Sequence, residues 1–443
     1  MASRHRTIVI VTEGAAPELL DRWCARGLLP GFARLRASGA HGALEAEGTP
    51  YEPPGLLSLL TGRRAADHGH YSYWSCHDPE YSPRVLTTAD RRHPLLWQHE
   101  AFAGMRFASI GIFGTHPVEP MDGSLISYPM NATLHACHPP SLQRALAKQG
   151  VRPVHDVSIF WTGQPRDQLL LQLLEADIQR GKAALALYED SDIVMVNLTS
   201  IDRTSHIYWQ ELELGPVRET ESAVFAAYRT CDRVIQDALE RADENTDVLA
   251  FSEMGFGPLR DYCSINELME QAGVLKHAPG GVDWQRSRAF EAVQGTHGVN
   301  INVSGRYRDG IVVPKDYEAV RDEVSAVLAE QINPRTGLPF FARVLRREEV
   351  YPGEATAGAP DLILEPADWR YLPKGDPHWA NHVHRDWQSG WHRRSSYWAG
   401  LGPGFGAGRV ERTAAAVDIP ATLCRLHGRD VPVEWSGVPL TDR

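Results

Sequence analysis

The stretch IVMVNLTSIDRTSH, residues 193–206, begins as a continuous apolar run and ends in polar side chains that can bind ligands. Other short apolar runs also end in polar residues, and they lie at 7–11, 107–112 and 248–251. Strands that are apolar throughout are typical of a parallel sheet buried on both faces. We therefore predict an α/β fold with a mostly parallel central sheet, helices on both faces, and a site at the carboxyl ends of the strands.

Longer amphipathic segments separate these strands. The segment 17–26 has Pro17 at its start and Gly27 directly after it, which is the usual punctuation of a helix. Further helices are expected at 164–188, 217–241 and 418–426, and a last strand at 396–402. Residues 299–313 alternate apolar and polar around a glycine-containing turn, which predicts a hairpin.

The 443 residues are expected to form a single domain. Two irregular stretches, 66–160 and 351–392, are rich in histidine, proline and tryptophan. We interpret them as cap segments over the mouth of the sheet, where substrate specificity would reside. No internal repeat is visible.

Composition narrows the classes of function. A formal net charge of −11 argues against nucleic acid as a partner, because binding a phosphate backbone needs a basic surface. No segment approaches the ~18 apolar residues that cross a membrane, so the cytoplasm is the expected location. The cysteines show no CxxC spacing and are expected to be ordinary thiols. A small-molecule substrate is the remaining expectation, and the sequence indicates no oligomeric state.

Asp202 and His206 directly follow the strand 193–198. A carboxylate and an imidazole four residues apart at the end of a strand can bind one divalent metal ion. The same spacing is also compatible with a helix cap and a surface histidine. The pair alone therefore leaves both interpretations open.

Motifs over nearly the whole chain add to this pattern. They include Pro53-Pro54 and Gly390-Trp391-His392, and the full set covers 7–14, 19–23, 29–35, 53–62, 68–69, 202–206, 251–258, 300–312, 389–392, 400–404 and 418–423. In order and spacing, these segments resemble the type I phosphodiesterase and nucleotide pyrophosphatase branch of the alkaline phosphatase superfamily. The resemblance implies an alkaline-phosphatase-like α/β fold and a site with two metal ions.

The resemblance also implies which residues bind the metals. One ion would be held by Asp202, His206 and His392, and all three family residues are present. The other ion is held in the family by an early Asp, a Thr or Ser nucleophile before Pro-Pro, and an Asp-His pair. At those positions this chain has Glu13, Glu52 and the pair Glu253-Met254.

Two interpretations of these departures compete. Decay to an inactive protein should scatter the replacements, whereas three of the four positions carry the same metal-binding side chain. We therefore predict a rebuilt site with ligands Glu13, Glu52, Asp202, His206, Glu253 and His392, a carboxylate-rich set that favours two iron or manganese ions, or zinc if the chemistry is hydrolytic. Met254 is expected to be packing.

Glu52 decides the reaction class, because a carboxylate offers no hydroxyl for a covalent phospho-enzyme. We predict a dinuclear metalloenzyme with non-hydrolytic, oxidative chemistry on a small molecule. The alternatives are a hydrolase of phospho- or sulfoesters that uses metal-bound water, and an inactive family member. Several histidine pairs have no assigned role, although His384 could replace His392 as a ligand; the unassigned residues are His68, His70, His135, His138, His382 and His384.

Overall fold

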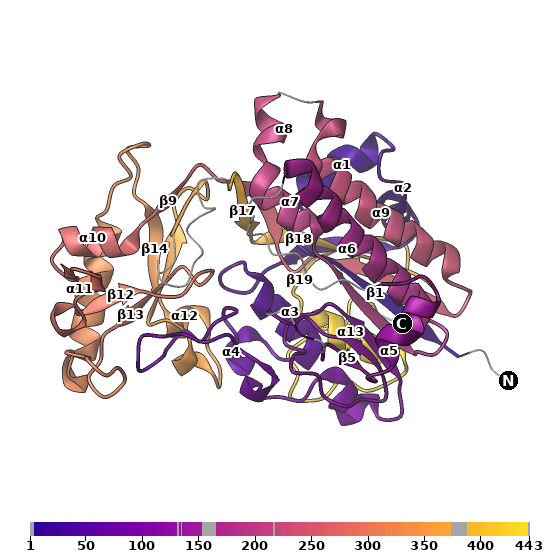
Figure 1. Ribbon diagram of the computed structural model, residues 1–443, viewed down its shortest axis with the longest axis horizontal. Helices are drawn as coiled ribbons and strands as arrows, with labels where there is room; N and C mark the ends of the chain where they lie inside the picture. Colours follow the sequence, from indigo (N-terminus) through magenta and orange to yellow (C-terminus); the bar gives the residue numbers. More distant parts are fainter. Residues whose placement is uncertain are drawn as a thin grey trace. The chain divides into compact units, whose positions relative to one another are not determined.

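The computed structural model describes residues 4–441 except 131–132, 134, 153–164, 216–217 and 374–387 (Figure 1). The chain forms two compact units. The first contains Met1–Arg64, Thr87–Gly257 and Trp387–Arg443, and the second contains Ala65–Leu86 and Pro258–Asp386. These boundaries do not coincide with the expected cap segments 66–160 and 351–392, since the chain returns to the first unit at Thr87.

A mostly parallel sheet forms the middle of the first unit. Within the described residues it has nine strands in the order β19-β2-β18-β7-β1-β6-β3-β4-β5. Their bounds are β1 (Arg6–Thr12), β2 (Ala40–Glu45), β3 (Phe107–Ile110), β4 (Gly123–Ile126), β5 (Cys137–His138), β6 (Ile193–Leu198), β7 (Thr246–Phe251), β18 (Ser395–Leu401) and β19 (Gly408–Ala414). β1 runs parallel to both β6 and β7, whereas β18 runs antiparallel to β7. The predicted α/β fold with a mostly parallel central sheet is confirmed.

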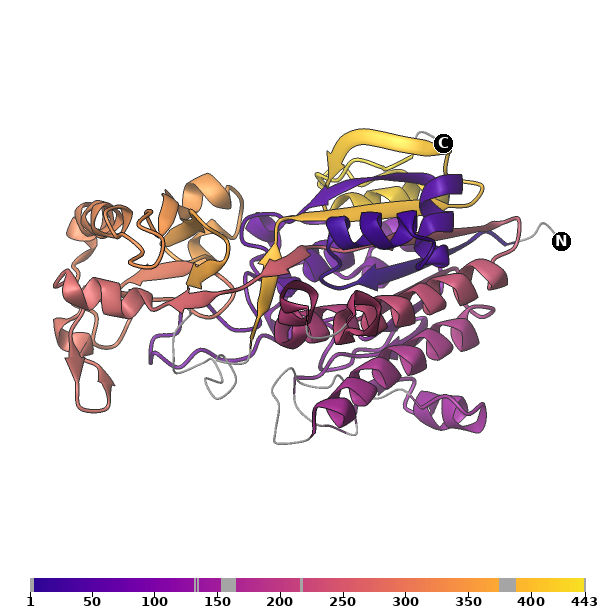
Figure 2. The ribbon, with the colours of Figure 1, turned by 90° about the horizontal axis from the view of Figure 1, so that it is seen from above.

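Helices cover both faces of this sheet. On one face lie α1 (Pro17–Ala25), α2 (Pro30–Ser38), α6 (Arg166–Leu187), α7 (Ser200–Tyr208) and α9 (Ala223–Arg241), and on the other α3 (Glu52–Thr61) and α13 (Asp418–Leu426) (Figure 1). Figures 1 and 2 both show α6 and α9 side by side. Alternate residues of β1, Ile8 and Ile10, enter a core that includes Trp23 and Tyr228. Two shorter helices of this unit are α5 (Leu142–Lys148) and α8 (Gln210–Leu214).

The second unit contains a four-stranded sheet in the order β12-β13-β15-β14. Its strands are β12 (Ala289–Glu291), β13 (Gly298–Ile301), β14 (Phe341–Arg346) and β15 (Leu362–Pro366), and its helices are α4 (Ala65–His68), α10 (Ile265–Gln271), α11 (Tyr317–Ala329) and α12 (Arg347–Val350). This unit also contains two strand pairs: β9 (Asp261–Cys263) with β16 (Tyr371–Pro373), and β10 (His277–Ala278) with β11 (Gly281–Val282).

The regular hairpin predicted over 299–313 does not form, although the chain folds back there: the Ser304 amide donates to the Val312 carbonyl at 2.8 Å, and the Ile311 amide to the Asn302 carbonyl at 3.0 Å. β13 pairs instead with β12 and β15, both antiparallel. Beyond Ile301, the Asn302 side-chain amide donates to the Trp284 and Ser287 carbonyls at 2.8 and 2.9 Å, which turns the chain away from a continued strand. The alternation of apolar and polar residues indicated a strand but not its partner.

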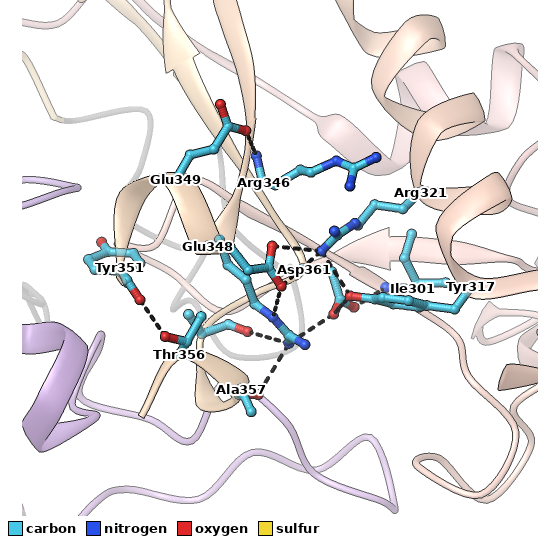
Figure 3. A network of polar contacts seen from close by, with 12 residues as sticks. Ile301, Tyr317, Arg321, Arg346, Glu348, Glu349, Tyr351, Thr356, Ala357 and Asp361 are labelled. Carbon is cyan, nitrogen blue, oxygen red and sulfur yellow. Dashed lines mark hydrogen bonds and ion pairs between the residues drawn. The ribbon is translucent and has the colours of Figure 1, made fainter. Parts of the chain in front are cut away.

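A buried carboxylate organises the polar interior of the second unit. Asp361 accepts hydrogen bonds from the Ile301 amide at 2.7 Å, the Tyr317 hydroxyl at 2.7 Å and the Arg306 guanidinium at 2.9 Å, and Arg347 lies 3.0 Å away. Figure 3 shows Asp361 with its neighbours Ile301 and Tyr317. Burial alone would raise the pKa of Asp361, but the Arg306 guanidinium holds it below its usual value.

None of the described helices combines the length and the apolar character that crossing a lipid bilayer requires.

Candidate metal centre

Carboxylates from four segments meet at one edge of the central sheet. Glu13 follows β1, Glu253 follows β7, and Asp202 lies in the first turn of α7, directly after β6. Because β6, β1 and β7 are neighbouring strands whose shared direction brings their carboxyl ends together, these side chains converge. Glu52 joins them as the first residue of α3. All four side chains are buried.

A glycine lets α3 approach the end of β7. A Cβ atom at Gly55 would lie only 2.5 Å from the Cβ atom of Glu253. Any larger residue would push the helix away and displace Glu52, which lies one turn earlier on the same helix.

The turn between β6 and α7 is fixed from behind by α6. The carboxylate of Asp177 accepts hydrogen bonds from the amides of Thr199 at 3.0 Å and Ser200 at 2.8 Å, at the N-terminus of α7. Arg180 donates to the Thr199 hydroxyl at 2.9 Å. Asp202 and His206 are four residues apart on this helix and therefore present their side chains on the same face.

Asp202, His206 and His392 bring three potential ligand atoms together, and we call them the histidine trio. The Nε2 atom of His392 lies 3.0 Å from Asp202 Oδ1 and 3.1 Å from His206 Nε2, and the distance from Asp202 Oδ1 to His206 Nε2 is 3.5 Å. His392 comes from β17 (Gly390–Arg393), which pairs with β8 (Gly255–Pro258). Separations of this size are those of ligand atoms around a single small cation.

The hydrogen bonds of the two imidazoles determine where their protons lie. His206 Nδ1 is 3.2 Å from the Gly390 carbonyl oxygen, and His392 Nδ1 is 3.2 Å from the Pro50 carbonyl oxygen. Because a carbonyl can only accept, each Nδ1 carries a hydrogen, and the Nε2 atom of each ring points into the trio. Two ring nitrogens and a carboxylate oxygen then face one another, an arrangement that a cation would satisfy. The residues of the histidine trio therefore fit a metal ion.

Burial favours the neutral form of His206 that a metal ligand requires. It lowers the pKa of His206 to about 3, so that the ring is neutral near pH 7. For Asp202 burial acts in the opposite direction, but the neighbouring His206 and Arg203 lower the pKa of the carboxyl group below its usual value. The rings of Phe256 and Trp391 pack against His206 with centroid separations of 4.9 and 4.6 Å and shield it from water.

Glu13, Glu52 and Asp202 form a second group, the carboxylate trio, whose ligand atoms lie within 4.8 Å of one another. The guanidinium of Arg203 lies against all three of its members. Its Nη1 atom is 2.5 Å from Asp202 Oδ2, and 3.5 Å from both Glu13 Oε1 and Glu52 Oε1. Its Nη2 atom donates to the Tyr128 hydroxyl at 2.7 Å. The carboxylate trio therefore already contains a cation from the chain itself.

The glutamates of the site resist ionisation. Burial, followed by the charge of Asp202, raises the pKa of Glu52 to about 8. Burial also raises the pKa of Glu13 and of Glu253 well above the usual value for glutamate. Asn197 donates to Glu13 Oε2 at 2.7 Å, whereas neither oxygen of Glu253 has a hydrogen-bond partner among the described residues.

The structure thus gathers five of the six predicted ligands into two trios that share Asp202. Among the described residues, no cluster of three potential ligands includes Glu253. Met254 is fully buried, as expected for packing. Arg203 was not predicted from the sequence, although it directly follows a predicted ligand.

None of the unassigned histidines that the structure describes is a member of either trio. His68 and His70 belong to the second unit, where the His70 amide donates to His68 Nδ1 at 3.1 Å. His138 hydrogen-bonds to the Met121 carbonyl at 3.1 Å, and His135 is exposed. His382 and the alternative ligand His384 lie outside the described residues.

Comparison with known proteins assigns the chain to a family. A family model described as type I phosphodiesterase/nucleotide pyrophosphatase matches residues 7–394. This match contains both trios and all six predicted ligands. No curated protein matches the chain in sequence.

Solved structures share the fold over almost the full length of the chain. The phosphonoacetate hydrolase from Sinorhizobium meliloti 1021, in complex with phosphonoformate, superposes with a TM-score of 0.66, at 16% identity and 96% coverage of both chains. The alkaline phosphatase PafA gives 0.63, at 14% identity and 99% coverage of both chains. Murine ectonucleotide pyrophosphatase/phosphodiesterase 5 gives 0.56, at 13% identity and 96% coverage of both chains. At these identities the likeness shows the fold alone.

Proposed function

This chain belongs to the type I phosphodiesterase/nucleotide pyrophosphatase family, and we propose that it is a metal-dependent enzyme that hydrolyses an ester of a phosphorus or sulfur oxyacid with an activated water molecule. One observation carries the proposal. The two Nε2 atoms and Asp202 Oδ1 face one another at 3.0–3.5 Å, with both imidazoles oriented by backbone carbonyls.

Hydrolysis here needs no covalent intermediate. A divalent ion held by Asp202, His206 and His392 would lower the pKa of a coordinated water molecule and supply the nucleophile. By the family resemblance, Glu52 would replace the family's hydroxyl nucleophile; it lies at the start of α3 and beside Asp202. In this proposal its carboxylate accepts the proton of the attacking water, a role of general base for which glutamate is suited.

Arg203 makes an anionic substrate compatible with the carboxylates. A charge of Glu52 would repel a phosphoryl group by on the order of 4 kcal/mol at ~4 Å and an effective dielectric of about 20. The Arg203 guanidinium offsets a repulsion of this size, because its positive charge lies 3.5 Å from the Glu52 carboxylate. The names of the structural neighbours, a phosphonoacetate hydrolase and an alkaline phosphatase, also support hydrolysis.

A second candidate is the oxidative reaction expected from the sequence. Two imidazoles and one carboxylate on one side of a cation form the ligand set of non-haem iron(II) oxygenases, and the histidine trio has this composition. Iron in the purified protein and oxygen consumption with a turned-over substrate would favour this candidate. Zinc or manganese with ester hydrolysis would favour the first.

The test is metal content and hydrolysis measured together. We expect wild-type protein to bind a divalent metal and to hydrolyse an aryl phosphodiester or an aryl sulfate. His206→Ala should lose both, whereas the control His138→Ala should keep both because His138 contacts neither trio. Full metal content in His206→Ala would contradict the assignment.

A further inference from the structure

We propose that Arg203 takes the place of a second metal ion, so that the protein binds one metal ion and supplies its second cation as a side chain. The inference rests on the proposed function, since it concerns the same site. It departs from the two metal ions expected from the sequence, and it follows from the geometry of the carboxylate trio.

The carboxylate trio does not fit a metal ion while Arg203 is in place. An ion shared by Glu13, Glu52 and Asp202 would need oxygen contacts of roughly 2.0–2.6 Å. The Nη1 atom already lies 2.5 Å from Asp202 Oδ2 and 3.5 Å from one oxygen of each glutamate. The nitrogen therefore lies against one oxygen of each carboxylate, and an ion bonded to the same oxygens would be forced against a positive charge.

The arginine is held there on several sides. Its side chain is 5% exposed, and its backbone belongs to α7, one residue from the ligand Asp202. The Nη2 atom donates to Tyr128, which follows β4, so the guanidinium is fixed from a different element. Movement out of the trio would break these contacts and leave a buried positive charge to find new partners.

A guanidinium and a metal ion differ in what they can do. Both compensate the charge of buried carboxylates and of an anionic substrate. The guanidinium stays protonated and has no vacant coordination position, so it can donate hydrogen bonds but cannot activate a water molecule. Only the histidine trio is then left to activate the nucleophile, and any oxidative reaction at the site would be mononuclear.

The test is the number of metal ions per chain, determined by titrating metal-free protein with Mn²⁺ and, separately, with Zn²⁺. We expect one equivalent for the wild type. Arg203→Ala should open the carboxylate trio and bind a second, weaker equivalent, which the triple variant Arg203→Ala, Glu13→Gln, Glu52→Gln should lose again. Arg321→Ala is the matched control: it removes another buried arginine, one that pairs with Glu318 and Glu348 and with no member of either trio, and it should stay at one equivalent.

Two equivalents in the wild type would overturn the inference, and so would a folded Arg203→Ala protein that stays at one. Arg203→Met, which keeps most of the side-chain volume, is measured in parallel in case the alanine variant does not fold. The wild-type stoichiometry decides by itself if neither variant folds. Wild-type protein that binds no metal would instead contradict the proposed function, so the two failures are distinguishable.

Discussion

The Nε2 atoms of His206 and His392 lie 3.1 Å apart, and the opposite nitrogen of each ring hydrogen-bonds to a backbone carbonyl. The two rings therefore point their Nε2 atoms at each other, and Asp202 Oδ1 faces the same point. Bringing these atoms together costs free energy unless a cation lies between them. Binding of a metal ion should therefore stabilise the folded protein.

Removing the metal should lower the melting temperature. A ligand that binds only the folded state stabilises it by about 2.7 kcal/mol at a free concentration of 100 times its Kd. Treatment with a chelator followed by dialysis should lower Tm, and added metal should restore it. In His392→Ala the same treatment should leave Tm unchanged, because one of the three ligands is gone. An equal response of the variant and the wild type would place the stabilising metal elsewhere.

Replacing Glu52 should abolish turnover without emptying the histidine trio. A positioned general base contributes about 10²–10⁴-fold to the rate, so Glu52→Gln and Glu52→Thr should each lower kcat by at least about 100-fold. Metal content should stay at the wild-type value, because Glu52 is not a member of the histidine trio. Phosphodiester turnover that survives Glu52→Thr unchanged would remove Glu52 from the mechanism.

Asp177 should act on the metal site at a distance. Its carboxylate holds the amides of Thr199 and Ser200, which position α7 and with it Asp202 and His206. We expect Asp177→Asn to weaken metal binding by about 10–100-fold, as is typical for groups that orient metal ligands. Asp232→Asn is the control, because Asp232 also accepts a backbone amide, that of Phe32 at 2.9 Å, but at the start of α2. Equal losses in both variants would indicate general destabilisation.

The stability of the second unit should fall in acid through Asp361. The pKa of this carboxyl group is lowered in the folded state, so its ionisation stabilises the fold above the unfolded-state pKa of about 3.9. That stabilisation is lost as the pH falls through the folded-state pKa. Asp361→Asn should cost about 3–5 kcal/mol at pH 7 and should flatten the dependence of stability on pH below about 4. Urea unfolding of both proteins between pH 7 and pH 3 measures this, and parallel curves would contradict it.

The main elements of the fold were predictable because buried parallel strands leave long apolar runs. The run 193–198 is a strand with the predicted bounds, and α6 (Arg166–Leu187) lies within the predicted helix at 164–188. The hairpin at 299–313 failed because alternation specifies a strand but not its partner. β13 pairs with β12 and β15, and the latter lies about 60 residues away in sequence.

The sequence indicated the candidate ligands that directly follow strands. It did not indicate Arg203, whose long side chain reaches back to the carboxylate of the preceding residue. Adjacent residues on a helix point about 100° apart, so Arg203 was not expected beside Asp202. The length of the arginine side chain overcomes this, and burial among carboxylates holds it there. The sequence also could not indicate that Glu253 lies outside both trios, because its position after β7 matches the family pattern.

The most direct measurement is anomalous diffraction at the metal absorption edge from crystals of metal-loaded protein. We predict one strong peak, from a metal ion bound by Asp202 and by the Nε2 atoms of His206 and His392, with the Arg203 guanidinium between Glu13 and Glu52. A second peak of comparable height among Glu13, Glu52 and Asp202 would contradict the role of Arg203. Metal-loaded crystals with no peak at the histidine trio would contradict the account as a whole.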